Sequence, residues 1–357
     1  MIKENHIIHI THNDGDAVGC ALVAALVYND SDVEENTYFC AIGTQDEKLK
    51  EVVIDEINKG TIPQMILISD LSLKEETCDW LQMLTRDYKI TVKGIDHHTT
   101  NHLDEKYPDM WKVYSAHYEN DMNSVISAAE AMLFKVFSQY EQNKFFNDLI
   151  CMISRYDTWE WKNHPRDWSK EYPGIREDIV DVNCKFMGPE ECFKMLFKWY
   201  FYCGLANTED IVPPVFKSIY NAVKKSETNF MDVVPVKAHV ANLLEDYTVA
   251  FFPFENDHAN AACEYIYNNY DYIDIVVVLY LASNKIGLRT KKNINLGELV
   301  KKYWGNNAGG HPAAAGATIS KVEMLGMVSS YLINSETLAD YDKKVKGGDE
   351  SGDAEGN

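Results

Sequence analysis

Short apolar runs alternate with longer helix-like segments over the first 100 residues of the chain. The apolar runs predict strands at residues 7–11, 37–42, 65–70 and 89–95. Helical segments follow the first two of them, at residues 17–28 and 47–58. Strands that alternate with helices indicate βαβ units, so we predict a mostly parallel sheet flanked by helices.

Two further patterns follow in the rest of the chain. Helix-like spacing covers residues 123–139, 144–155 and an aromatic-rich stretch at 163–234, which we predict to be a helical connector. From residue 236 a second α/β pattern begins, with strands predicted at 236–243, 248–252, 273–281 and 285–290. We therefore expect four regions: an α/β domain at 1–162, the connector at 163–234, a smaller α/β domain at 235–335, and an acidic, disordered tail at 336–357.

The composition is that of a soluble globular protein in a reducing compartment. Hydrophobic residues make up 46% and charged residues 25% of the 357 positions, and no apolar run approaches the roughly 20 residues that a membrane-spanning helix needs. The amino terminus lacks the charged start and long apolar core of a signal peptide. The eight cysteines include no Cys-x-x-Cys pair, which argues against a zinc ribbon or a disulfide framework. We therefore predict a cytoplasmic protein with no membrane partner.

The net charge of −21 restricts the partners that we expect. Proteins that track long nucleic acids carry a basic stripe, because contacts to phosphates dominate their affinity. This chain has only short basic pairs such as Lys291-Lys292, so a nucleic-acid partner would be short and a long duplex is not expected. The acidity also has a simpler interpretation, which is solubility.

Acidic residues directly follow three of the predicted strands. Asp14, Asp70 and Asp96 each come immediately after an apolar run. The carboxyl ends of parallel strands meet at one edge of a sheet, where ligands bind, so we expect these side chains to lie close together. Asp16 adds a second carboxylate to the first turn, and two carboxylates side by side repel unless a cation lies between them. Such Asp-x-Asp turns are also typical of helix caps and solvated loops.

The triplet Asp96-His97-His98 at a predicted strand end is a more unusual feature. Imidazole together with carboxylate suits manganese, zinc or iron better than magnesium or calcium. Asp157 follows the helix predicted at 144–155 and supplies a further carboxylate. Together these residues predict a site for divalent metal ions.

Ordered motifs in both halves of the chain resemble those of the DHH phosphoesterase family. This chain has residues that look like the four amino-terminal motifs of the family, in the same order: Asp14-Gly15-Asp16-Ala17, Asp70, Asp96-His97-His98 and Asp157. The associated DHHA1 domain is similar to residues 309–316, Gly-Gly-His-Pro-Ala-Ala-Ala-Gly, and to the preceding Gly287-Leu288-Arg289-Thr290. The resemblance covers residues 5–330 and is strongest to the oligoribonuclease (nanoRNase) and RecJ-like subgroup. It implies a DHH metal-binding catalytic domain at 1–162 and a DHHA1 substrate-binding domain at 235–335.

The resemblance also implies a set of metal ligands. Asp14 and Asp70 would bind one ion, and Asp70 would bridge to a second. Asp16, His97 and Asp157 would hold that second ion. The expected cofactors are two divalent ions, Mn²⁺ first, with Mg²⁺ or Co²⁺ as alternatives. A water or hydroxide between them would be the nucleophile.

The implied catalytic residues are Asp96 and His98. Asp96 would orient His97 or lie in the inner shell, and His98 would contact the scissile phosphate or help to protonate the leaving group. The implied substrate-binding residues belong to the second domain and are Arg289, Gly309, Gly310 and His311. Closely spaced glycines let backbone N–H groups approach a phosphate, and a glycine turn that only packs a helix on a strand is the alternative.

One departure from the family concerns an early histidine. Many relatives have a metal-binding histidine four residues before the first aspartate, where this chain has Ile10. His12 lies two residues before Asp14, as in a subgroup of oligonucleotide-degrading members. His12 is therefore a candidate metal ligand, phosphate contact or buried hydrogen-bonded residue. His9 falls on the other face of its strand and is expected to be structural.

Three functions follow from the resemblance. The leading one is a Mn²⁺-dependent phosphodiesterase or exonuclease that degrades short oligonucleotides with a two-metal-activated water. The second is action on small nucleotides, such as adenosine 3′,5′-bisphosphate or cyclic di- or oligonucleotides. The third is a non-catalytic nucleotide-binding module. A homodimer and a monomer both stay open.

Overall fold

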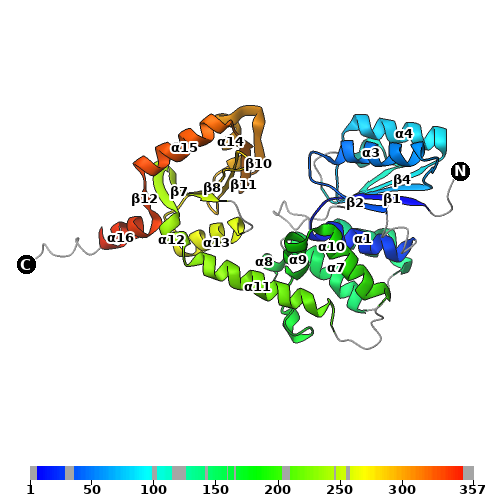
Figure 1. Ribbon diagram of the computed structural model, residues 1–357, viewed down its shortest axis with the longest axis horizontal. Helices are drawn as coiled ribbons and strands as arrows, with labels where there is room; N and C mark the ends of the chain where they lie inside the picture. The colour runs from blue at the N-terminus through cyan, green and yellow to red at the C-terminus, as the bar shows by residue number, and fades with distance from the viewer. Residues whose placement is uncertain are drawn as a thin grey trace, which may run out of the picture. The chain divides into compact units, whose positions relative to one another are not determined.

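The computed structural model describes residues 6–28, 36–98, 103–114, 126–140, 144–158, 160–164, 166–202, 210–244, 247–254 and 258–348. The chain forms two compact units, Met1–Ala222 and Val223–Asn357. Each unit has a sheet of its own (Figure 1). No helix among the described residues combines the length and apolar character that crossing a membrane requires.

Unit 1 is built on a five-stranded sheet in which every strand runs parallel to its neighbours. The strand order is β2-β1-β3-β4-β5. Its strands are β1 (Ile7–Thr11), β2 (Thr37–Phe39), β3 (Met65–Ser69), β4 (Thr91–Asp96) and β5 (Trp111–Val113). The parallel sheet confirms the predicted fold class, and β1 to β4 overlap the apolar runs that predict strands.

The sequence does not predict the edge strand β5. It has only three residues, too few for an alternation of polar and apolar positions to show. Its place depends on a tertiary contact with β4, because Gly94 and Trp111 are partners in the register of the two strands. A Cβ at position 94 would come within 2.3 Å of the Trp111 ring, so only glycine leaves room for the indole there.

Helices cover both faces of the sheet of unit 1 (Figure 1). On one face, α3 (Gln45–Asn58) and α4 (Glu75–Tyr88) pack with Ile8 of β1. On the other face, α1 (Gly15–Val27) packs with Ile7 and with helices further along the chain. Because successive side chains of a strand point to opposite faces, one apolar run supplies both cores.

The remaining helices of unit 1 pack against α1 or connect the strands. They are α5 (Leu103–Lys106), α6 (Ala128–Ala131), η1 (Met132–Val136), η2 (Ser138–Tyr140), α7 (Lys144–Asp157), α8 (Glu160–Asn163), η3 (Trp168–Lys170), α9 (Ile179–Met187), α10 (Pro189–Phe197) and η4 (Lys198–Tyr202). Aromatic side chains such as Phe193 and Phe197 of α10 are buried in the core around α1. The described residues of the stretch predicted as a connector, 163–234, thus include several helices. Its helix α11 (Pro214–Met231) spans the boundary between the units.

Unit 2 is built on a seven-stranded sheet of order β10-β11-β9-β8-β7-β6-β12. Its strands are β6 (His239–Leu243), β7 (Tyr247–Phe254), β8 (Ile275–Tyr280), β9 (Lys285–Arg289), β10 (Ala308–His311), β11 (Ala314–Thr318) and β12 (Glu336–Thr337). Its helices are α12 (Val234–Lys237), α13 (Ala259–Asn269), α14 (Leu296–Trp304), η6 (Gly305–Asn307), α15 (Lys321–Asn334) and α16 (Leu338–Gly348). β7 and β8 pair in parallel, and the other described pairs are antiparallel. The second α/β pattern is confirmed, and its last two predicted strands correspond to β8 and β9, which pair antiparallel.

Two parts of unit 2 differ from the sequence prediction. β10 and β11 form a ribbon in a glycine- and alanine-rich stretch whose composition is that of a turn. Residues 336–348 form β12 and α16, although the sequence predicts a disordered tail there. Leu338 is fully buried beside Val234 and Val240, so this segment has an apolar anchor on the core. Residues 349–357 lie outside the described part of the chain.

Candidate metal centre

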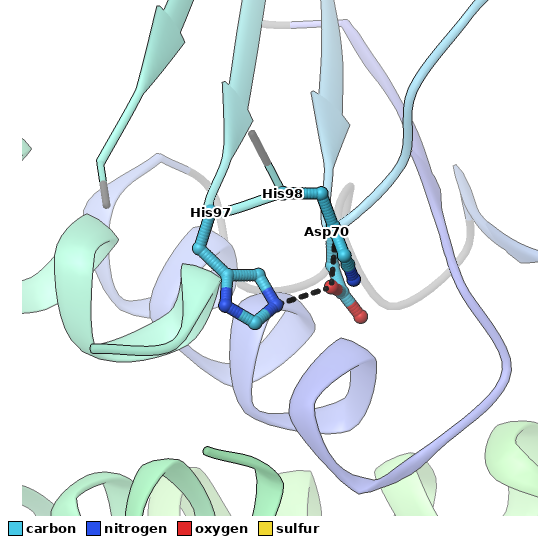
Figure 2. Close-up of side chains that lie close together, drawn as sticks. All are labelled: Asp70, His97 and His98. Carbon is cyan, nitrogen blue, oxygen red and sulfur yellow. Dashed lines mark ion pairs between the residues drawn. The ribbon is translucent and has the colours of Figure 1, made fainter. Parts of the chain in front are cut away.

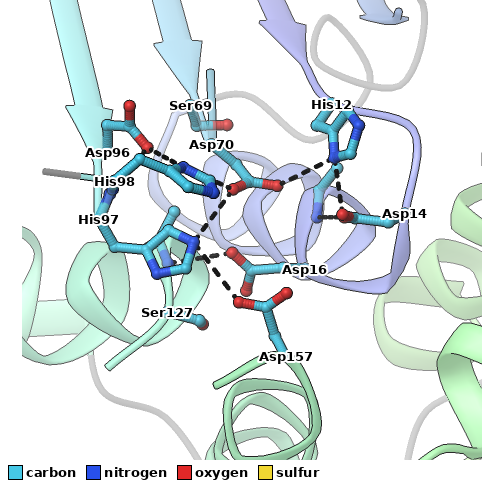
Figure 3. Close-up of polar contacts among 12 residues, drawn as sticks. His12, Asp14, Asp16, Ser69, Asp70, Asp96, His97, His98, Ser127 and Asp157 are labelled. Atoms are coloured by element: carbon cyan, nitrogen blue, oxygen red, sulfur yellow. Dashed lines mark hydrogen bonds and ion pairs between the residues drawn. The ribbon is translucent and has the colours of Figure 1, made fainter. Parts of the chain in front are cut away.

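The predicted ligands gather at the carboxyl edge of the sheet of unit 1 (Figure 3). β1 and β3 are neighbours in this sheet, with β2 beyond β1 on one side and β4 beyond β3 on the other. Such a point, where the strand order reverses, opens a crevice in which parallel α/β sheets bind ligands. Asp14 follows β1, Asp70 follows β3 and Asp96 ends β4, so carboxylates line the crevice.

One set of ligand atoms, the outer group, belongs to His12, Asp14 and Asp70. One nitrogen or oxygen of each lies within 4.8 Å of the others. Asp14 caps α1, because its Oδ1 accepts a hydrogen bond from the backbone N–H of Ala17 at 3.0 Å. Its Oδ2 lies 2.6 Å from Nδ1 of His12, and that nitrogen is 3.8 Å from Oδ2 of Asp70. The turn after β1 thus presents an imidazole and a carboxylate side by side.

A second set, the inner group, belongs to Asp16, His97 and Asp157. Asp16 lies in the first turn of α1 and accepts hydrogen bonds from the backbone N–H groups of Ala128 and Ala129, at 3.0 and 3.3 Å. Nε2 of His97 lies 3.4 Å from Oδ2 of Asp157, which is the last residue of α7. The inner group therefore depends on α1, β4 and α7 being packed together.

Asp70 lies between the two groups. Its Oδ1 is 3.4 Å from Nε2 of His97 and 4.0 Å from Nδ1 of His98 (Figure 2). Its backbone is left-handed, with a φ of 54°, and its N–H donates to the carbonyl of Ile95 at 3.0 Å. A residue other than glycine adopts this conformation at a cost in free energy, and such residues cluster at functional sites.

The carboxylate of Asp96 is fully engaged by hydrogen bonds. Its Oδ1 accepts from the backbone N–H groups of His97 and His98 at 2.8 and 3.2 Å, and from Nδ1 of His98 at 2.8 Å. Its Oδ2 accepts from Oγ of Ser72 at 2.7 Å. Burial alone would raise the pKa of Asp96, but the hydrogen bonds and the charge of His98 outweigh it and lower the pKa. The ring that Asp96 holds is that of His98.

The cluster is electrostatically unfavourable without a cation. Burial, followed by repulsion from Asp14 and other carboxylates, raises the pKa of Asp70 well above its usual range. Burial and the charge of Asp16 do the same to the pKa of Asp157. For Asp16 itself, burial and the charge of Asp14 raise the pKa to about 7. Burial lowers the pKa of His97 to about 4, so its imidazole is neutral and able to bind a metal.

Several buried atoms of the cluster have no hydrogen-bond partner among the described residues. They are Oδ2 of Asp70, Nε2 of His97 and Oδ2 of Asp157. Buried polar atoms are normally satisfied, so these atoms indicate a bonding partner that is not part of the chain. Carboxylate oxygens and a neutral imidazole nitrogen are ligands that divalent metals accept. The residues therefore fit two cations, one at each group, with Asp70 in reach of both.

Asp181 of α9 is a charged neighbour of the centre that the sequence does not reveal. It lies against Gly15, where a Cβ would come within 3.3 Å of Asp181, and it lines a small cavity together with Asp14 and Asp157. Its Oδ2 pairs with Nζ of Lys185 at 2.7 Å. In the sequence this is an ordinary pair four residues apart on a predicted helix, so no signal distinguishes it.

The residues predicted to bind substrate lie on neighbouring strands of unit 2. β11 runs between β9 and β10, and its Ala314 is the register partner of both Arg289 and His311. Gly310 has a φ of 141°, and a Cβ there would come within 2.5 Å of the Ala314 carbonyl oxygen, so the ribbon itself requires this glycine. Gly309 has open space where a side chain would be. The side chain of His311 lies outside the described part of the chain.

Comparison with known proteins supports the resemblance in both halves. Residues 245–333 match the DHHA1 domain family. The oligoribonuclease NrnB of Bacillus subtilis (strain 168) is 23% identical over 317 residues, which cover 87% of this chain and 72% of that protein. Both matches are to proteins of the kind that the sequence motifs resemble, DHH/DHHA1 phosphoesterases.

Solved structures of other proteins share the fold of the chain. The DHH domain of a member of a family of ribosomal proteins has a TM-score of 0.58 at 14% identity, and covers 92% of this chain and 86% of that chain. RecJ of Thermus thermophilus, in complex with Mn²⁺, has a TM-score of 0.54 at 11% identity, and covers 91% of this chain and 51% of that chain. The match with RecJ is thus to about half of the longer protein.

Proposed function

We propose that this DHH-family phosphoesterase hydrolyses phosphodiester bonds of short oligonucleotides with two divalent cations. The observation that carries the proposal is the pair of three-residue ligand groups with Asp70 between them. The outer group, His12, Asp14 and Asp70, would hold one cation, and the inner group, Asp16, His97 and Asp157, would hold the other. When bound, the cations supply an activated water and neutralise negative charge on the phosphate.

Manganese is the cation that we propose. Both groups mix an imidazole with carboxylates, a donor set that suits Mn²⁺ better than Mg²⁺. RecJ of Thermus thermophilus, which shares the fold, was solved with Mn²⁺. In this chain, His97 and His12 would supply the nitrogen donors.

His98 is proposed as the proton donor to the leaving oxygen. Its side chain is half exposed at the crevice, and its Nδ1 is held by Asp96, which leaves Nε2 for the substrate. Burial lowers the pKa of His98, but the hydrogen bond to Asp96 and the nearby carboxylates raise it overall, which favours the protonated form that a proton donor needs. Water adds to phosphorus, the bond from phosphorus to the leaving oxygen breaks, and the proton of His98 passes to that oxygen.

Short oligonucleotides are the substrates that we propose. NrnB, which matches most of this chain, is an oligoribonuclease. The net charge of −21 disfavours a protein that tracks a long strand, since such proteins depend on phosphate contacts. Arg289, Gly309, Gly310 and His311 of the DHHA1 domain are the proposed contacts to the end of the substrate.

The test is a substrate panel in the presence of Mn²⁺. It contains labelled RNA and DNA of two to five nucleotides, long strands, adenosine 3′,5′-bisphosphate, cyclic dinucleotides and pyrophosphate. We expect turnover of the short strands to be lost in Asp70→Asn and kept in Asp55→Asn, a matched change at an exposed aspartate of α3. Inactivity on the whole panel would overturn the proposal that the protein is an enzyme. Preferential turnover of pyrophosphate would overturn the proposal that it is a nuclease.

A further inference from the structure

A groove of about 660 Å³ opens beside the candidate metal centre in unit 1. It is lined by Asp70 and His98, and by residues of the β2–α3 and β3–α4 connections, so it is continuous with the centre. Its volume falls within the range of sites that enclose small molecules, about 300–1,000 Å³. A groove of this size suits a nucleotide rather than a long strand.

An apolar surface forms part of this groove. Ile42, in the turn after β2, is 74% exposed and lines the groove. Leu71 and Leu73 line it as well and are buried in the core beneath α3 and α4. A large aliphatic side chain exposed beside the metal centre is a surface on which the flat face of a base can pack.

A spare positive charge lies in the same groove. Lys74 is exposed and lines the groove, and its ammonium group has no ion-pair partner in the described part of the chain. The neighbouring carboxylates are engaged elsewhere: Asp46 accepts a hydrogen bond from the backbone N–H of Lys74 at 3.0 Å, and Glu75 pairs with Lys106. In a chain with a net charge of −21, an unpaired lysine beside the metal centre is suited to bind an anion.

Two helix N-termini reinforce this positive potential. α3 and α4 both begin at the groove, and neither of the residues at their capping positions, Thr44 and Lys74, caps its helix with a side chain. The amino-terminal end of a helix carries partial positive charge and binds phosphate. The acidic residues of the first turns reduce this potential, which leaves Lys74 as the main cationic group.

We infer that this groove binds the leaving nucleoside of the substrate and the phosphate on the far side of that nucleoside. The base or sugar packs on Ile42, and Lys74 binds the 5′-phosphate of the nucleoside whose 3′-oxygen leaves. The inference rests on the proposed phosphodiesterase activity, because it places the substrate by the position of His98 and Asp70. It adds a substrate-binding site within unit 1 and predicts preference for a 5′-phosphorylated dinucleotide.

The experiment compares three substrates that share one reacting phosphate diester. Bis(p-nitrophenyl) phosphate lacks a nucleoside, the dinucleotide ApA has a 5′-hydroxyl, and pApA has a 5′-phosphate. We expect Lys74→Gln to lower kcat/KM for pApA about 5- to 10-fold and to leave ApA and the nitrophenyl ester unchanged. Ile42→Ser should lower kcat/KM about 5-fold for both dinucleotides and spare the nitrophenyl ester. Lys59→Gln, at an exposed lysine outside the groove, is the matched control for charge.

The possible outcomes distinguish a failure of the proposed role of the groove from a failure of the proposed phosphodiesterase activity. Equal effects of Lys74→Gln on ApA and pApA, or no effect on either, would overturn the assignment of Lys74. Loss of turnover of the nitrophenyl ester in Ile42→Ser would mean that this change damages the metal centre, and would overturn the assignment of Ile42. If the wild type hydrolyses none of the three substrates, the proposed function fails. If the wild type is active but the variants do not lose activity selectively on the dinucleotides, only the proposed role of the groove is overturned.

Discussion

The outer and inner ligand groups of the metal centre are built by different means. In the outer group, His12 and Asp14 are two residues apart and contact each other at 2.6 Å, and Asp14 also caps α1. In the inner group, Asp16, His97 and Asp157 come from three elements that only the folded core brings together. His12 and Asp14 of the outer group are therefore held by local contacts, whereas the residues of the inner group are held by tertiary packing.

The two groups also differ in how well they tolerate the absence of a cation. The imidazole of His12 lies against the carboxylate of Asp14 and offsets part of its charge. Among the described residues, the inner group has buried atoms of two residues, His97 and Asp157, without a hydrogen-bond partner, whereas the outer group has one such atom, Oδ2 of Asp70. Buried, unsatisfied charge opposes folding, so a cation should add more stability at the inner group than at the outer one.

The largest effect is expected from the residue that the groups share. Asp70→Asn should lower kcat/KM by more than about 100-fold, since even residues that only support metal ligands cost 10- to 100-fold. Asparagine also tolerates the left-handed backbone of position 70, so the fold should be kept. Calorimetric titration with Mn²⁺ should show weakened binding at both groups. Two cations bound with wild-type affinity would contradict a bridging place for Asp70.

The free energy of unfolding, measured with and without cation, tests the expected difference in stabilisation between the inner and outer groups. At a Mn²⁺ concentration about 100 times the dissociation constant, the free energy of unfolding should rise by about 2.7 kcal/mol per site. Asp157→Asn removes the charge of a partly buried carboxylate whose Oδ2 has no hydrogen-bond partner among the described residues, so it should be more stable than the wild type in EDTA and gain less from Mn²⁺. Urea unfolding of both proteins, with Asp55→Asn as control, measures this. An unchanged gain in Asp157→Asn would show that the inner group holds no cation.

Asp96→Asn should have an intermediate effect, because Asp96 supports the histidines and belongs to neither group. We expect kcat/KM to fall about 10- to 100-fold, with two cations still bound. Ser72→Ala, which removes only the hydrogen bond to Oδ2 of Asp96, should have a smaller effect. Loss of one bound cation in Asp96→Asn would instead place Asp96 among the ligands.

His12→Asn tests the outer group alone. Because Asp14 and Asp70 remain, we expect a loss of kcat/KM of about 10-fold and weaker binding of one cation, with the other unchanged. Calorimetry separates the two sites if their affinities differ. Equal weakening of both sites would show that His12 acts through the fold rather than at the outer group.

The smallest effect concerns a histidine that belongs to neither group. Burial lowers the pKa of His9 to about 3, while Nε2 of His9 lies 2.8 Å from Oγ of Ser69. Between pH 3 and pH 6.5 the unfolded chain binds a proton that the folded chain does not, so stability falls as the pH drops through this range, by up to about 1.4 kcal/mol per pH unit. His9→Gln should reduce this slope. We would compare urea unfolding of both proteins at pH 7.5 and 5.5 with saturating Mn²⁺, and equal slopes would contradict a buried neutral His9.

Much of unit 1 and its crevice is predictable from the sequence because the signals are local. The apolar runs of β1, β3 and β4 are long enough to show, and an acidic residue follows or ends each of them. The rule that parallel strands share a carboxyl edge then brings Asp14, Asp70 and Asp96 together. The roles proposed for these residues remain predictions.

What the sequence does not reveal depends on contacts between distant residues. Asp181 approaches Gly15 only because α9 packs on α1, and an ion pair with Lys185 hides it among ordinary helix pairs. His97 and His98 are equivalent candidates in the sequence, and only the folded chain shows that the imidazole bonded to Asp96 is that of His98. The groove beside the centre likewise requires two connections, each unremarkable alone, to come together with His98.

The close packing of Trp111 on Gly94 has a consequence for how variants of this protein would be interpreted. The strand that carries Trp111 continues to Val113, the register partner of Asp96, and the N–H of Tyr114 donates to the Asp96 carbonyl at 2.8 Å. Any side chain at position 94 would displace the indole and, with it, the edge strand that supports the backbone of the Asp-His-His triplet. In a genetic screen such a change would be scored as a loss of metal binding. Its cause would be a single methyl group at position 94, which is itself no metal ligand.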